Sequence, residues 1–113
     1  MRTVWKFDVP MEDVFRVSLP RGARILGVQA MPAQDDAAGA ESVHFWALVD
    51  TDAPEEIRRF YLATTGNPFP VPAHLLNDVW HVGSFQLSGG SFVGHLFGVT
   101  FPIDEDQANG KVS

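Results

Sequence analysis

Apolar and polar side chains alternate along most of this chain, and this period-two pattern constrains the fold more than any other feature. In residues 14–19, Phe15, Val17 and Leu19 share one face, with Arg16 and Ser18 opposite. Such alternation is typical of a β-strand with one buried face. The same pattern predicts further strands over residues 3–7, 24–30 and 56–64.

Residues 43–49 differ, because apolar side chains occupy both faces and His44 is the only polar one. This composition suits a central strand buried on both sides. The run is too short, and too rich in aromatic and β-branched residues, to favour a helix. Residues 55–59 leave a choice, since they can begin either a strand or a short helix.

The clearest local signal is Gly89-Gly90, which separates two runs of strand-forming residues. Two glycines at the centre of a two-residue turn predict a β-hairpin, because both positions need positive φ. In the resulting register Ser84 lies opposite His95. Phe85 lies opposite Gly94, and its ring covers the glycine.

These segments predict one mainly-β domain over residues 1–103, with six or seven strands. Antiparallel pairing is expected because no connection is long enough for a helical crossover. The fold class is a small β-sandwich or a rolled, partly closed barrel, with at most one short helix near residues 72–77. The acidic, small-residue segments 31–42 and 104–113 are expected to be a mobile loop and a flexible tail.

The amino-acid composition excludes several classes of function and site. The 113 residues include 14 acidic and 8 basic side chains, and the net charge of −6 argues against general nucleic-acid binding. The chain has no cysteine, which excludes disulfides, thiolate zinc sites and a cysteine nucleophile. No apolar run reaches the roughly 18 residues of a membrane span. We expect a cytoplasmic protein without membrane contact, and a homo-oligomer, since a domain of this size gains stability from association.

Motifs of common enzymes are missing. The chain has no HExxH metal motif, no GxSxG elbow and no phosphate-binding glycine loop. Strict alternation puts His81 and His95 on opposite faces of the hairpin, so we expect them to share no metal ion. Ser84, His95 and a distant acid can be drawn as a triad, which leaves a small hydrolase using His95 as an alternative. The sequence favours a protein without catalytic residues, metal or cofactor.

The turn at residues 64–68 is the best candidate for a binding element. It concentrates hydroxyls, an amide and a glycine whose backbone a ligand can approach closely. We predict a binding surface that joins this turn to the polar face of the hairpin. The only adjacent basic pair would supply cations for a small anionic ligand. The predicted site residues are Thr65, Gly66, Asn67, Ser84, Gln86, His95, Arg58 and Arg59.

Blocks in a fixed order cover residues 3–98: TVWKF at 3–7, LPRGARILGVQ at 19–29, WALVDTDAP at 46–54, RRF at 58–60, TTGNPFP at 64–70, GSFQ at 83–86 and HLF at 95–97. The chain thereby resembles an uncharacterised family of small phage and bacterial proteins with the pattern WALVDPEAP, GTGHPIP and GGSLVWHLFE. Asn67, Gly94 and Gly98 stand where that pattern has His, Trp and Glu. The resemblance implies a phage or prophage source and supplies no reaction or ligand.

We therefore expect a non-enzymatic phage or prophage accessory protein that binds a host protein or a small signalling molecule. Such proteins take over host factors or counter host defences, and they act in the host cytoplasm. A minor structural or decoration protein of the virion is the first alternative, and the hydrolase using His95 is the second.

Overall fold

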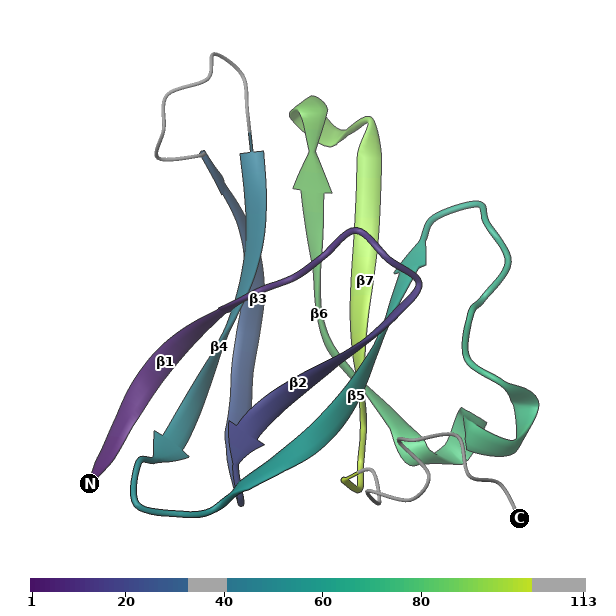
Figure 1. Cartoon of the computed structure of the whole chain (residues 1–113). Helices are drawn as coiled ribbons and strands as arrows, with labels where there is room; N and C mark the ends of the chain where they lie inside the picture. The colour runs from purple at the N-terminus through teal and green to yellow at the C-terminus, as the bar shows by residue number, and fades with distance from the viewer. Residues whose placement is uncertain (33–40, 103–113) are drawn as a thin grey trace.

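The computed structural model describes residues 1–32 and 41–102, which form two antiparallel sheets packed face to face (Figure 1). The three-stranded sheet has the order β1 (Arg2–Asp8), β4 (Glu41–Asp50), β3 (Arg24–Pro32). The four-stranded sheet has the order β2 (Val14–Pro20), β5 (Glu55–Thr64), β7 (Phe92–Val99), β6 (Val79–Leu87). No hydrogen-bonded strand pair joins the two sheets within these ranges, so of the two predicted architectures the sandwich is confirmed and the barrel is excluded.

The predicted helix near residues 72–77 is confirmed as a short 3-10 helix, η1 (Ala73–Asp78). Residues 55–59 form the start of β5, which settles the choice between strand and helix. The predicted bounds of the mobile loop, 31–42, include too many residues, because β3 continues to Pro32 and β4 starts at Glu41. Its remaining part, and the predicted tail at 104–113, lie outside the described residues.

The core lies between the sheets, and stacked phenylalanine rings lie among its aliphatic side chains. Phe45 of β4 and Phe60 of β5 are fully buried, with ring centroids 4.9 Å apart, and Phe15 of β2 stacks on Phe60 at 5.4 Å. Each fully buried side chain of this kind stabilises the fold by about 1.5–3 kcal/mol relative to an exposed one. The alternation seen in the sequence therefore marks one apolar face on each sheet.

β4 is the central strand of its sheet, as its composition predicts, but it is not buried on both faces. The inward side chains of Val43, Phe45, Ala47 and Val49 are at most 3% exposed. The outward side chains, including His44 and Trp46, are half-buried. The reason is that a two-layer sandwich covers only one face of each sheet, with no helical layer outside.

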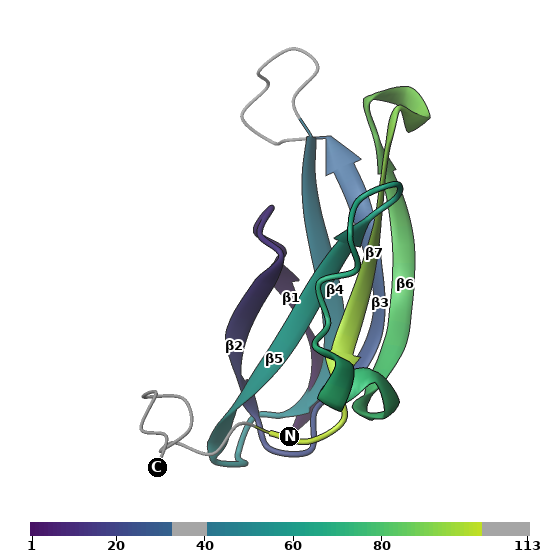
Figure 2. The same cartoon turned by 90° about the vertical axis from the view of Figure 1, so that its right-hand side faces the viewer.

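The β5–β6 connection folds back over the outer face of the four-stranded sheet (Figure 2). Val71 and Leu75 of this connection form a second small core with Tyr61 of β5 and Val99 of β7. Apolar packing therefore covers one part of this outer face. Polar residues of β6 and β7 occupy the part nearer the hairpin tip.

The β6–β7 hairpin has the predicted register. Ser84 pairs with His95 and Phe85 with Gly94, and the Ser91 N–H closes the turn on the Ser88 carbonyl at 3.3 Å. The ring of Phe85 covers Gly94, as expected.

One hairpin prediction is wrong, namely that His81 and His95 lie on opposite faces. A β-bulge between His81 and Gly83 inserts an extra residue into β6. An extra residue shifts the alternation by one position, so the side chains beyond it change face. His81 therefore joins Ser84 and His95 on the outer face.

Candidate functional site

Four polar side chains from three segments form a hydrogen-bonded chain on the outer face of the four-stranded sheet. Thr65 Oγ1 lies 2.8 Å from His95 Nε2, and Ser84 Oγ lies 2.7 Å from His95 Nδ1. His81 Nε2 lies 3.0 Å from Ser84 Oγ. We call Thr65, His95, Ser84 and His81 the polar chain.

Local folding explains how these residues meet. Ser84 and His95 are directly opposed in the hairpin, and the bulge turns His81 toward Ser84. Thr65 follows the end of β5, the other neighbour of β7, and its N–H donates to the Val93 carbonyl at 3.1 Å. Two strand pairings and one bulge thus determine the geometry.

The turn after Thr65 is tight. Gly66 has a φ of +89°, which other residues rarely adopt. The Asn67 N–H donates to the Thr64 carbonyl at 3.1 Å, and the Asn67 side-chain amide donates to the Thr64 hydroxyl. Residues 65–67 are exposed, so a ligand can approach the main chain around Gly66.

The protons of the polar chain can be arranged in more than one way. The Ser84 hydroxyl has one proton and two lone pairs, so it donates to one histidine and accepts from the other, or accepts an N–H from both. A neutral His95 that accepts from Ser84 at Nδ1 donates from Nε2 to Thr65, which leaves the Thr65 proton available to a ligand. In the reverse arrangement Thr65 donates to His95 and offers lone pairs instead. The chain can thus present either a donor or an acceptor.

Most side chains of the polar chain are exposed to solvent. His81, Ser84 and Thr65 are exposed, while His95 is half-buried. Gln86 is also exposed and lies two residues along β6 from Ser84, on the same face. The second nitrogen of His95 contacts a hydroxyl, whereas the histidine of a Ser–His–Asp triad contacts a carboxylate. Directional recognition of a polar group is the chemistry that this arrangement suits best.

The structure brings together most of the predicted surface. Thr65, Ser84 and His95 are in contact, and Gln86 shares their face. Gly66 and Asn67 continue the same turn, although the side chain of Asn67 points to Thr64.

Arg58 and Arg59 lie elsewhere, on the half of β5 that pairs with β2. Arg58 is 12% exposed, and its Nη1 donates to the Ala23 carbonyl at 3.1 Å. Burial lowers the pKa of Arg58, and the carboxylate of Glu56 acts in the opposite direction. Arg59 lies opposite Arg16 across the β2–β5 pair. Neither arginine joins the polar chain.

The sequence reasoning missed His81. The place of His81 in the polar chain depends on the β-bulge, which period-two alternation cannot predict. Gly83 in the interior of a strand was the available signal, because glycine inside a strand often marks a bulge.

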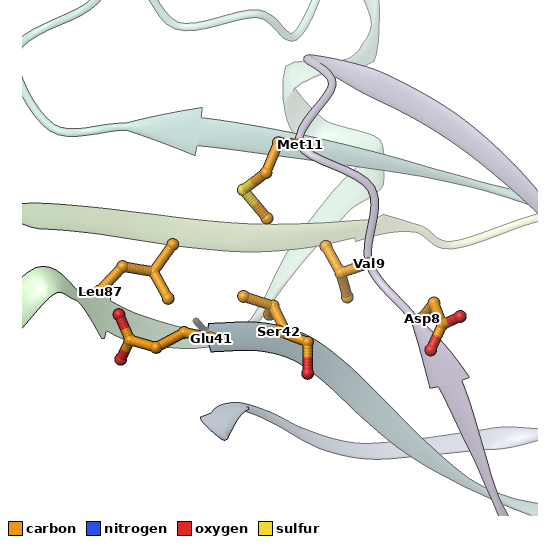
Figure 3. Close-up of a pocket in the computed structure, with 7 residues that line it drawn as sticks. Asp8, Val9, Met11, Glu41, Ser42 and Leu87 are labelled. Carbon is orange, nitrogen blue, oxygen red and sulfur yellow. The ribbon is translucent and has the colours of Figure 1, made fainter. Parts of the chain in front are cut away.

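Within residues 1–32 and 41–102, two cavities lie beside the β1–β2 connection and share Met11 and Leu87. The Asp8 cavity, of about 320 Å³, is lined by Asp8, Val9, Met11, Glu41, Ser42, Val43 and Leu87 (Figure 3). The Asn67 cavity, of about 360 Å³, is lined by Met11, Glu12, Asp13, Leu62, Thr64, Asn67, Leu87 and Phe92. The 64–67 turn therefore contributes to the polar chain through Thr65 and to a cavity through Thr64 and Asn67.

Over residues 1–32 and 41–102, no three histidine or acidic side chains gather in a way that could hold a metal ion. In the same part of the chain, no helix has the length and apolar character needed to cross a membrane.

Fold and site define an antiparallel β-sandwich with a polar hydrogen-bonded chain on one outer face. A family model described as Domain of unknown function (DUF7352) matches residues 1–107, and the chain belongs to this family. Neither the curated proteins nor the solved structures include a match. The expectation of an uncharacterised family is thus confirmed.

Proposed function

We propose that the protein is a binding module that presents the polar chain to its ligand. It would serve as a phage or prophage accessory protein that acts on a host protein or a small signalling molecule. The observation that carries the proposal is the hydrogen-bonded chain of Thr65, His95, Ser84 and His81. Exposed hydrogen bonds of this kind contribute little to folding, because water competes for the same groups. Their alignment on one face therefore supports a role in recognition.

The chemistry of the face indicates how a ligand would be held. The polar chain offers hydroxyls and imidazoles, and the Gln86 amide lies beside them. The half-buried Arg58 donates to the Ala23 carbonyl, away from the polar chain, so it adds no free cation here. Recognition by directional hydrogen bonds is therefore favoured over recognition by charge. The proposal includes a cytoplasmic location. It also includes the association of identical chains, which analytical ultracentrifugation would measure.

The test is affinity capture from infected host cells, with mass spectrometry of captured proteins and small molecules. Three baits are compared: the unaltered chain, the double variant Ser84→Ala/Thr65→Val, and the control His74→Gln. His74 is an exposed histidine of η1, outside the polar chain. We expect a specific species on the unaltered chain and the control, reduced about tenfold or more on the double variant. Equal capture by all three folded baits contradicts the proposed site.

A virion protein is the first alternative. Mass spectrometry of purified particles separates the two functions, because an accessory factor acting on the host is absent from particles. Stoichiometric presence in particles would favour the structural role.

A small hydrolase is a second candidate, because Ser84 Oγ lies 2.7 Å from His95 Nδ1. A hydrogen bond between a serine hydroxyl and an imidazole nitrogen activates the serine as a nucleophile, although triads use Nε2 where this site uses Nδ1. A fluorophosphonate reagent tests it. Labelling of Ser84 that is lost in His95→Ala favours the hydrolase. No labelling, together with no turnover of a nucleotide and ester panel, favours the binding module.

A further inference from the structure

The Asn67 cavity combines an apolar floor with a polar rim. Leu62, Leu87, Phe92 and Met11 supply the apolar lining, and Met11 is half exposed at 51%. The volume of about 360 Å³ is at the small end of the range for ligand sites. The site is therefore large enough for the apolar body of a small molecule.

The rim is rich in hydrogen-bond acceptors. The Nδ2 of Asn67 gives one of its two N–H groups to the Thr64 hydroxyl, which leaves one N–H and the Oδ1 acceptor of Asn67. Ionised Glu12 and Asp13 accept hydrogen bonds and cannot donate them. Within residues 1–32 and 41–102, neither of these two carboxylates has a hydrogen bond or an ion pair. Three acceptor groups thus border one apolar cavity.

The neighbouring Asp8 cavity has a similar volume, but its carboxylates are less available to a ligand. Figure 3 shows Met11, Val9 and Leu87 pointing toward one another, with Glu41 and Ser42 beside them. Asp8 Oδ1 lies 3.0 Å from Nδ1 of His44, and Glu41 accepts the Ser88 N–H at 2.8 Å. In that cavity Asp8 lies at ion-pair distance from a histidine without forming a hydrogen bond, and Glu41 accepts a backbone N–H, whereas the carboxylates of the Asn67 cavity have no such partner among the described residues.

We propose that the Asn67 cavity binds a small primary amine with an apolar body. An ammonium group has three donors and no acceptor, which matches Asn67 Oδ1 and the carboxylates of Glu12 and Asp13. The apolar body would contact Leu62, Leu87 and Phe92. The net charge of −6 favours a cation over an anion throughout. The polar chain takes no part, so this site is independent of the function proposed above.

The test is a methyl NMR titration of the full, untagged chain with three six-carbon compounds: hexylamine, hexan-1-ol and hexanoate. They share one apolar stem and differ in the head group. We expect hexylamine to shift the methyl signals of Met11, Leu62 and Leu87. Hexanol should bind about tenfold more weakly, and hexanoate should give no shift. Equal binding of amine and alcohol overturns the proposal, as does the absence of any shift with millimolar hexylamine.

Variants locate the ammonium. The double variant Glu12→Gln/Asp13→Asn removes two negative charges and keeps the shape of both side chains. We expect it to weaken hexylamine binding about tenfold while hexanol binding stays the same. Asp8→Asn is the matched control, because it removes a charge from the neighbouring cavity alone, and amine affinity should not change. An unchanged amine affinity in the double variant overturns the assignment.

Discussion

The two faces of the β6–β7 hairpin differ in what surrounds them: one packs in the core and the other faces solvent. On the inner face, Phe85 covers Gly94 and both are buried in the core between the sheets. On the outer face, Ser84 and His95 lie one residue away from that pair and exchange a hydrogen bond in solvent. Substitutions on the inner face should therefore change stability, and substitutions on the outer face should change binding.

Phe85→Ala should have the largest effect. The ring is 5% exposed and belongs to the main core, and its removal also uncovers Gly94. We expect a loss of about 3–5 kcal/mol in the free energy of unfolding, as is usual for a buried phenylalanine. Urea denaturation measures it. A loss below about 1 kcal/mol would mean that the core does not depend on this face of the hairpin.

Gly94→Ala tests the same contact from the other strand. A Cβ atom at position 94 would overlap three atoms of the Phe85 ring. Overpacking of this kind costs about 1–3 kcal/mol. Combining it with Phe85→Leu should cost less than the two single losses together, since the smaller side chain makes room. Additive losses would show that the two positions are not coupled.

These inner-face features follow from local sequence, and that is why they could be predicted. Alternation places Phe85 and Leu87 on one face, and Gly89-Gly90 fixes which residues of β6 and β7 are paired. The contact of Ser84 with His95 follows from the same register. Thr65 was expected near them, and the pairing of β5 with β7 brings it there.

Other features depend on geometry that one segment cannot reveal. The bulge that moves His81 is visible in the sequence only as Gly83. The Asn67 cavity draws residues from the β1–β2 connection, β5, the turn after β5 and the hairpin, so no single stretch of sequence predicts it. Arg58 and Arg59 read as one basic pair, yet neighbouring residues of a strand face opposite sides, which alternation alone could have shown.

Arg58 and Arg59 lie on opposite faces of β5 and should likewise differ in their effect on stability. Arg58 donates to the Ala23 carbonyl, and Ala23 is itself buried. Arg58→Ala leaves that carbonyl without its donor and should cost about 1–3 kcal/mol in the free energy of unfolding. The adjacent control Arg59→Ala should change stability by about 0.5 kcal/mol or less, since it sits across from Arg16, where like charges gain nothing from proximity. Thermal and urea unfolding of both variants measure the difference, and equal losses would contradict it.

Ser84→Ala should have the smallest effect on stability and decides what the outer face is for. The hydroxyl is exposed and links His81 to His95, so its removal breaks the polar chain in the middle. Water replaces the lost partners at both histidines, and we expect a change within about 0.5 kcal/mol in the free energy of unfolding. The NMR signals of both imidazoles should nevertheless move, because each loses a hydrogen bond to the same oxygen. A loss above about 1.5 kcal/mol would show that the polar chain holds the hairpin together and would remove the reason for assigning it to recognition.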